Sequence, residues 1–237
     1  MENLPPPELR ARIDRFDWYQ RIPLGDDYAT PGEDTYTTQK LSMLQMPADL
    51  SGKSVLDIGC SEGFFCFEAE RRHAARIVGI DRAPHLGEKI ALLKEITGSR
   101  IEFEDKTVYD LARLAGAPFD LVIFLSVFQH LDHPYLALDL IASATRTTAI
   151  MEIPVAVKIA DDAAFQRDPQ ALMRRSAKGR RILLPNESML GEMLSDAGFV
   201  AIDRLARHRP RDVPGYGGAF RQERLILHAH KSAARLI

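Results

Sequence analysis

Two short segments of the chain contain residue types that could hold a nucleoside. Segment 55–63, VLDIGCSEG, joins an apolar run to a turn bounded by Gly59 and Gly63. Glycines at the end of a buried strand let the backbone approach a ligand closely before a helix begins. Segment 77–81, IVGID, ends in Asp81, and a carboxylate there can accept hydrogen bonds from both ribose hydroxyls of an adenosine. Together they predict a nucleoside site at the carboxyl ends of two strands.

The glycine turn also restricts which nucleoside fits. A dinucleotide fingerprint reads G-x-G-x-x-G, whereas this turn reads GCSEG from Gly59 to Gly63. It lacks the middle glycine that makes room for a pyrophosphate. Cys60 is interpreted as a small residue that fits the turn, not as a nucleophile. A dinucleotide is therefore not expected.

The elements that must position this site alternate between apolar strands and helices. Short, almost wholly apolar strands separated by helical stretches are typical of a parallel sheet covered on both faces. The pattern predicts an α/β, doubly wound, Rossmann-like fold. Strands near 199–208 and 223–231 flank the turn DVPGYGG, which favours antiparallel pairing and a reversed last strand. These complete a seven-stranded, mostly parallel sheet, whose earlier strands are expected near 54–59, 76–81, 100–104, 119–126 and 148–154.

Residues 1–50 differ from the rest of the chain. They are rich in aromatic residues, Asp, Gly and Pro without sustained strand alternation, so we expect a lid or cap with short helices near 8–15 and 36–46. The main domain is expected over 51–237. Within it, the polar stretch at about 155–183 is expected to form an insertion. Asn186 should cap a later helix, which Gly198 ends.

Composition and charge exclude several classes of protein. Hydrophobic residues make up 46% of the chain and charged residues 27%, as in globular proteins. The 31 Lys and Arg against 33 Asp and Glu leave a net charge of −2, so overall charge gives no reason to expect binding to nucleic acid or an anionic membrane, and only local basic patches could do so. No apolar run approaches the ~18 residues that cross a bilayer, so we expect a cytoplasmic protein. Cys60 and Cys66 lack the spacing of a disulfide framework or zinc site, and no metal is expected.

The D-x-G-x-x-x-G form from Asp57 to Gly63 resembles motif I of class I S-adenosylmethionine-dependent methyltransferases. The resemblance covers most of the chain, from about Trp18 to Lys231. It is closest to the branch that contains the tRNA wobble-uridine carboxymethyltransferases and their small-molecule-type relatives. Besides motif I and the Asp81 segment, it is carried by the stretches 18–32, 108–111, 119–138 and 184–199.

The resemblance implies roles for individual residues toward S-adenosylmethionine. Asp57 would orient the glycine turn, and Gly59 would face the methionine moiety. Val108 and Tyr109 would lie against the adenine, unless they are simply core residues. The cofactor-binding residues expected on this basis are Asp57, Gly59, Cys60, Gly63, Asp81, Arg82, Val108, Tyr109, Leu125 and Ser126, the last two near the transferred methyl group.

The segment after the fourth expected strand departs from that branch. Gln129 replaces a tyrosine that, in carboxymethyl-transferring members, would help to hold the extra carboxylate of the donor. Arg224 matches another residue of that carboxylate site. Because the set is incomplete, ordinary S-adenosylmethionine is the expected donor.

Several residues are candidates for contact with the methyl acceptor. His130 has a side chain with a near-neutral pKa that suits removal of a proton from a hydroxyl or amine, and it is the candidate catalytic residue. The alternative is a structural histidine that bonds a loop. Glu152, at the end of the fifth expected strand, either contacts substrate or caps a loop. Further candidates for substrate contact are Trp18, Tyr19, Gln129 and Arg224.

These observations predict transfer of a methyl group from S-adenosylmethionine to an oxygen or nitrogen of a small molecule. One alternative is a tRNA uridine-modifying (carboxy)methyltransferase, which two arginine-rich stretches, 173–181 and 204–211, could serve. Another is a non-catalytic nucleoside-binding module, which would be expected to have lost Gly59, Gly63 or Asp81. The sequence identifies neither the acceptor nor the oligomeric state.

Overall fold

The computed structural model describes residues 7–25, 28–33, 37–159, 163–175, 179, 181–213 and 215–232. Two compact units divide the chain, Met1–Thr107 and Val108–Ile237. Tyr36, one of the aromatic residues of the expected lid, lies outside the described residues.

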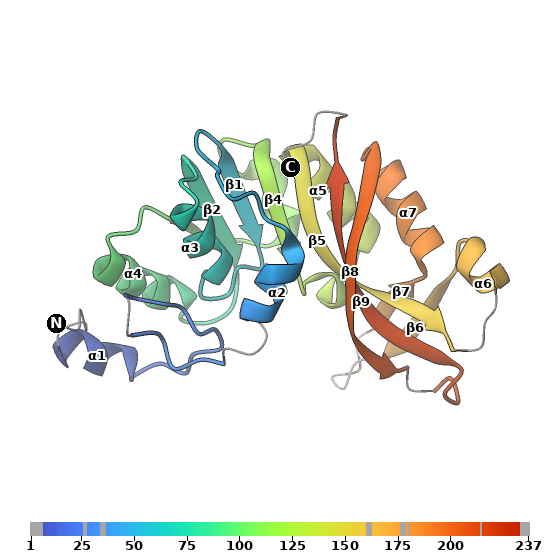
Figure 1. Cartoon of the computed structure of the whole chain (residues 1–237), viewed down its shortest axis with the longest axis horizontal. Coiled ribbons are helices and arrows are strands. Elements are labelled where there is room, and N and C mark those ends of the chain that lie inside the picture. Colours follow the sequence, from blue (N-terminus) through green and yellow to red (C-terminus); the bar gives the residue numbers. More distant parts are fainter. Residues whose placement is uncertain are drawn as a thin grey trace. The chain divides into compact units, whose positions relative to one another are not determined.

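The first unit contains a three-stranded parallel sheet with the strand order β3-β2-β1. β1 and β2 are rich in branched apolar residues, and apart from residues at their ends they are buried, which suits strands covered on both faces. Figure 1 shows these strands together with helices α1 to α4. The elements are α1 (Pro7–Ile13), α2 (Thr37–Leu44), β1 (Ser54–Ile58), α3 (Phe64–Arg71), β2 (Arg76–Asp81), α4 (Leu86–Thr97) and β3 (Glu102–Asp105).

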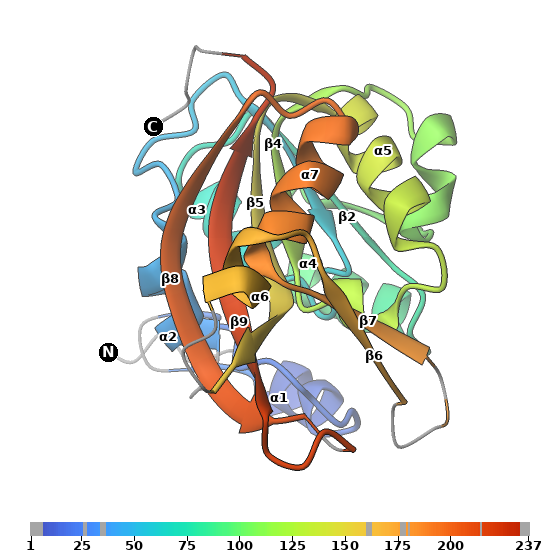
Figure 2. The same ribbon diagram turned by 90° about the vertical axis from the view of Figure 1, so that its right-hand side faces the viewer.

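The second unit contains four strands in the order β4-β5-β9-β8 and a separate two-stranded sheet of β6 and β7. β4 and β5 are parallel, and β9 is antiparallel to both of its neighbours. Figure 2 shows β5, β9 and β8 side by side. The elements are η1 (Val108–Arg113), β4 (Phe119–Leu125), η2 (Phe128–His130), α5 (Pro134–Ala144), β5 (Thr145–Lys158), α6 (Ala163–Arg167), β6 (Ala171–Arg175), β7 (Arg181–Pro185), α7 (Glu187–Asp196), β8 (Ala201–Asp212) and β9 (Phe220–His230).

The expected fold class is confirmed. The seven-stranded, mostly parallel sheet of a doubly wound α/β fold is present, and its reversed strand is the last one in the chain. The expected helix caps are also present. Asn186 accepts a hydrogen bond from the amide of Met189 at 2.8 Å, and Gly198 follows α7 with a φ of 95°.

The region after Pro154 differs from the expectation. β5 continues to Lys158, because β9 pairs with it as far as Phe220 and supplies hydrogen-bond partners to the added residues. The expected insertion then contains α6 and the β6–β7 hairpin. In β6, exposed and half-buried side chains alternate, as is typical of a strand. The strand was not predicted because its arginines make this stretch of the sequence look simply polar.

No helix in the described part of the chain is long and apolar enough to cross a membrane.

Candidate functional site

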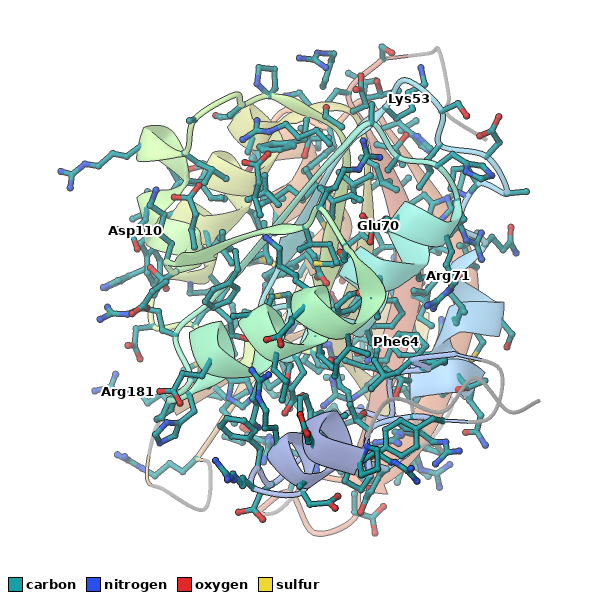
Figure 3. The ribbon with its side chains drawn as sticks, turned by 90° about the vertical axis from the view of Figure 1, so that its left-hand side faces the viewer. Lys53, Phe64, Glu70, Arg71, Asp110 and Arg181 are labelled. Atoms are coloured by element: carbon teal, nitrogen blue, oxygen red, sulfur yellow. The ribbon has the colours of Figure 1, made fainter. Side chains whose placement is uncertain are left out.

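The turn between β1 and α3 has the backbone geometry of a ligand-binding loop. Gly59 and Gly63 have φ angles of 74° and 93°, which only glycine adopts without strain. The amides of Gly59 and Cys60 donate to the carbonyl oxygen of Ile80, at 2.8 and 3.2 Å, and fasten the turn to the end of β2. α3 begins directly after Gly63, and Figure 3 labels Phe64 in its first turn.

Asp81 is held at the end of β2 by backbone amides. Its Oδ2 accepts from the amide of Ser61 in the glycine turn at 2.9 Å. Its Oδ1 accepts from the amides of Arg82 and Ala83 at 2.6 and 3.1 Å. The carboxylate therefore has a fixed orientation beside the turn, as a group that binds a ribose requires.

Arg82 contributes to this arrangement through its backbone. Its guanidinium is largely exposed and lies 3.3 Å from the carboxylate of Asp105, the last residue of β3. In this structure the side chain of Arg82 thus pairs with the neighbouring strand. A direct contact of Arg82 with the cofactor remains a prediction.

Asp57, at the end of β1 before the turn, is buried. Burial raises its pKa to about 7, and the thiol of Cys66 donates to its Oδ2 at 3.5 Å. Gly79 is paired with Asp57 across the two strands, and a Cβ there would lie 2.9 Å from the Sγ atoms of both Cys60 and Cys66. The two thiols therefore fill the space that a side chain at Gly79 would need, and they support the glycine turn from its buried side.

The thiols are not suited to nucleophilic chemistry. A hydrogen bond with Cys60, together with burial, raises the pKa of the Cys66 thiol well above its ordinary value. Both cysteines are buried. A neutral, buried thiol is a poor nucleophile, so the geometry agrees with the interpretation of Cys60 as a small packing residue.

Glu62, inside the glycine turn, ties the turn to the N-terminal segment. Its Oε1 accepts from the amide of Tyr19 at 3.1 Å and from Lys89 Nζ at 2.9 Å, while Ser61 Oγ donates to Oε2 at 2.8 Å. Burial opposes ionisation of Glu62, but these hydrogen bonds outweigh it and lower its pKa. The carboxylate is only 2% exposed, so it serves an internal contact.

Two further contacts hold the same segment in place. Lys89 Nζ donates to the carbonyl oxygen of Asp17 at 2.5 Å and lies 5.3 Å from the ring centroid of Trp18. Gln20 Oε1 accepts from the amide of Phe64, in the first turn of α3, at 3.1 Å. We name Asp17–Gln20 the docked segment. Trp18 and Tyr19, two residues of the expected lid, belong to it.

In the second unit, the candidate residues after β4 come together. Ser126 follows β4 with a φ of 60°, and its Oγ donates to Glu152 Oε2 at 2.5 Å. Gln129 Nε2 donates to the carbonyl oxygen of Ser126 at 2.6 Å and lies 3.3 Å from Nε2 of His130. His130 is exposed. The four side chains therefore form one polar cluster in this unit.

Glu152 is wholly buried and lies within β5, not at its end as expected. In the sheet Glu152 is paired with Leu125, the last residue of β4. β4 therefore ends beside Glu152, while β5 itself and its other neighbour, β9, continue past it. His208 Nε2 lies 2.7 Å from Glu152 Oε1. Arg224 Nη1 lies 3.6 Å from its Oε2.

Tyr109 holds the loop that follows His130. Its hydroxyl oxygen accepts from the amide of His133 at 3.0 Å, and the two rings meet edge to face. A pocket of about 510 Å³ is lined there by residues 132–136. Val108 is buried. Contact of Val108 or Tyr109 with an adenine remains a prediction.

Comparison with known proteins identifies the family. The model of the family described as "Methyltransferase domain" matches residues 35–203, which is more than half of the chain. The chain belongs to this family. The match confirms the expected assignment to the S-adenosylmethionine-dependent methyltransferases.

Curated relatives match a shorter part of this methyltransferase chain. The ubiquinone biosynthesis O-methyltransferase of Neisseria meningitidis serogroup C (strain 053442) is 35% identical over 96 residues, or 40% of each chain. The tRNA U34 carboxymethyltransferase of Campylobacter jejuni subsp. jejuni serotype O:6 (strain 81116 / NCTC 11828) is 31% identical over 86 residues, 36% of this chain and 29% of that one. The chain thus spans less than half the length of either relative in these matches.

Solved structures agree with the methyltransferase fold. The N-terminal domain of EvdMO1, crystallised in the presence of SAH and D-fucose, superposes with a TM-score of 0.69 at 15% identity. The match covers 94% of this chain and 95% of that one. At this identity the likeness concerns the fold alone.

Three contacts in and around the candidate site of this methyltransferase were not expected from its sequence. Glu62 and Lys89 hold the docked segment, and His208 lies against Glu152. A charged residue inside a glycine turn was a signal for Glu62. Lys89 and His208 depend on packing between elements far apart in the sequence, which no local pattern reveals.

Proposed function

We propose that this protein transfers a methyl group from S-adenosylmethionine to a hydroxyl or amine of a small-molecule acceptor. The observation that carries the proposal is the glycine turn, together with the Asp81 carboxylate that three backbone amides orient beside it. A left-handed turn next to a fixed carboxylate fits a nucleoside with free ribose hydroxyls. Asp81 would hold the ribose, and Gly59 and Gly63 would let the backbone approach the donor.

S-adenosylmethionine, when bound, supplies an electrophilic methyl group. The protein then has to position the acceptor in line with that group, and positioning accounts for much of the rate. The Oε1 atom of Gln129 is buried and has no hydrogen-bond partner among the described residues. It is therefore suited to accept a hydrogen bond from an acceptor hydroxyl or amine. Next to it, exposed His130 would take up the proton that the acceptor loses.

Calorimetric titration with S-adenosylmethionine and S-adenosylhomocysteine tests the donor site. We expect both to bind, and Asp81→Ala to weaken both by at least about tenfold, the cost of losing hydrogen bonds to a charged group. Asp105→Ala is the matched control, because Asp105 is the carboxylate at the end of the adjacent strand and is paired with Asp81 in register. Equal loss in the two variants, or no binding by the wild-type protein, would refute the proposed donor site.

Modification of a tRNA uridine is the second candidate, supported by the 31% identity with a tRNA U34 carboxymethyltransferase. The stretch 204–211 argues against it, since Arg204 and Arg207 both pair with Glu187 and Arg207 also pairs with Glu223. These partners reduce the charge available to a phosphate backbone. The candidate predicts tRNA binding that falls steeply with salt, together with preference for the carboxylated donor. We expect neither in a filter-binding or calorimetric titration.

A non-catalytic module would bind the donor without turnover. Gly59, Gly63 and Asp81 are all present, as a functional donor site requires. Formation of S-adenosylhomocysteine in the presence of an acceptor separates the two cases.

A further inference from the structure

Three arginines of the second unit lie close enough to influence one another electrostatically. Arg174 lies on β6, Arg211 on β8 and Arg224 on β9. Arg211 is paired with Gln222, two residues before Arg224 on the same strand, so the side chains of Arg211 and Arg224 leave the sheet on the same face. Arg211 Nη2 donates to Gln222 Oε1 at 3.3 Å.

The arginines repel one another in a partly buried place. Burial and the charges of Arg211 and Arg224 lower the pKa of Arg174. Burial and the charge of Arg224 likewise lower the pKa of Arg211. Each of these groups therefore experiences the positive charge of another, an arrangement that costs free energy unless an anion offsets it.

Two of the guanidinium groups also have unused donors. Arg174 Nε and Arg224 Nη1 are buried and have no hydrogen-bond partner among the described residues. Buried donors without an acceptor are uncommon in folded proteins and call for an explanation. A ligand with negatively charged oxygens would satisfy both atoms.

Two carboxylates lie beside Arg224, one in space and one in the sequence, and both have other partners. Glu152 lies 3.6 Å from Arg224 Nη1, but it also faces His208 and accepts from Ser126. Glu223, which adjoins Arg224 in the sequence, pairs with Arg207. Of the three arginines, Arg224 thus lies beside a carboxylate that also has other partners.

We propose that Arg174, Arg211 and Arg224 bind an anionic group, a carboxylate or a phosphate, of the methyl acceptor. The inference rests on the proposed function and names its substrate class. Guanidinium groups suit this role, because their planar forks match the oxygens of carboxylates and phosphates. Glu152 lies beside both Arg224 and Ser126, so an acceptor anchored by its anion would extend toward the polar cluster after β4.

The test titrates the protein, saturated with S-adenosylhomocysteine, with inorganic phosphate and with succinate, and uses dimethyl succinate as the neutral probe. We expect saturable binding of at least one anion and none of the ester. Whichever anion binds more tightly identifies the group that the acceptor carries. Arg211→Ala and Arg174→Gln should each weaken anion binding by at least about tenfold and leave S-adenosylhomocysteine affinity unchanged.

Arg204→Ala is the matched control, because Arg204 is also on β8 but pairs with Glu187. It should bind the anions as the wild-type protein does. Absence of saturable anion binding in a protein that binds S-adenosylhomocysteine, or equal binding by Arg211→Ala, would overturn the inference alone. Preference for a carboxylated donor that is lost in Arg224→Ala would overturn it too, by assigning the arginines to the donor. Failure to bind S-adenosylhomocysteine would instead refute the proposed function.

Discussion

At the scale of single residues, the glycine turn of the proposed donor site is supported by buried groups in and beside it. Asp57, Gly79 and the two cysteines support the glycine turn without belonging to its surface. The sequence motif predicted Asp57 and the glycines. It could not predict Gly79, because the need for a residue without a Cβ becomes visible only when the thiols of Cys60, in the turn, and Cys66, on α3, meet next to it.

Replacement of Asp57 should make the stability of the protein less dependent on pH. Its pKa rises from 3.8 in the unfolded chain to about 7 in the fold, so the stability that its protonated form contributes is present below pH 3.8 and is lost as pH rises through 7. The shift corresponds to roughly 4 kcal/mol. Asp57→Asn should therefore gain stability relative to the wild type between pH 5 and pH 8, as urea unfolding at about these two values would measure. A stability difference that does not change with pH would contradict this account.

Gly79→Ala should destabilise the protein and weaken donor binding. The added methyl group would meet Cys60 Sγ and Cys66 Sγ at 2.9 Å, and relief of that overlap must displace the turn. We expect a loss of roughly 1–3 kcal/mol in unfolding free energy, typical of overpacking. Gly191→Ala in α7 is the control, since nothing lies within 4 Å of its Cβ and the change should stabilise the helix. Adding Cys66→Ala to Gly79→Ala should restore part of the lost unfolding free energy. A double variant no more stable than Gly79→Ala would exclude the steric cause.

At the scale of elements, the docked segment is fastened to the glycine turn and to α4 by contacts that centre on Glu62 and Lys89. Elsewhere in the N-terminal part, Ile13 and Ile22 are wholly buried. Truncation would therefore expose core side chains. A point substitution is the sharper way to release the segment.

Lys89→Met should release the docked segment while the fold remains. The change removes the hydrogen bond to Asp17, the ion pair with Glu62 and the contact with the Trp18 ring, but it keeps the aliphatic stem. We expect proteolysis near 17–20 to become several-fold faster and S-adenosylhomocysteine to bind about three- to tenfold more weakly. Lys53→Met provides a control on a lysine away from these contacts. Unchanged proteolysis and affinity would show that the docking does not depend on Lys89.

At the scale of the whole molecule, local patterns predicted the fold class well. Apolar runs separated by helices identified the strands of the parallel part, and the turn between β8 and β9 identified the reversed strand. The length of β5 and the β6–β7 hairpin were missed, since both depend on partners distant in the sequence. The grouping of the three arginines was missed for the same reason. Arg224 was noted from the family resemblance, and Arg174 and Arg211 only as members of two arginine-rich stretches, because the three residues lie on three different strands.

The double use of the glycine turn has a thermodynamic consequence. Its left-handed glycines are proposed to let the backbone approach the donor, while Glu62 in the same turn holds the docked segment. Two binding events that share one structural element are linked, and linkage is reciprocal. The factor by which release of the docked segment weakens donor affinity must equal the factor by which bound donor lowers the equilibrium constant for that release. Hydrogen exchange at Tyr19, measured with and without S-adenosylhomocysteine, would therefore report the same coupling free energy as a donor titration of Lys89→Met.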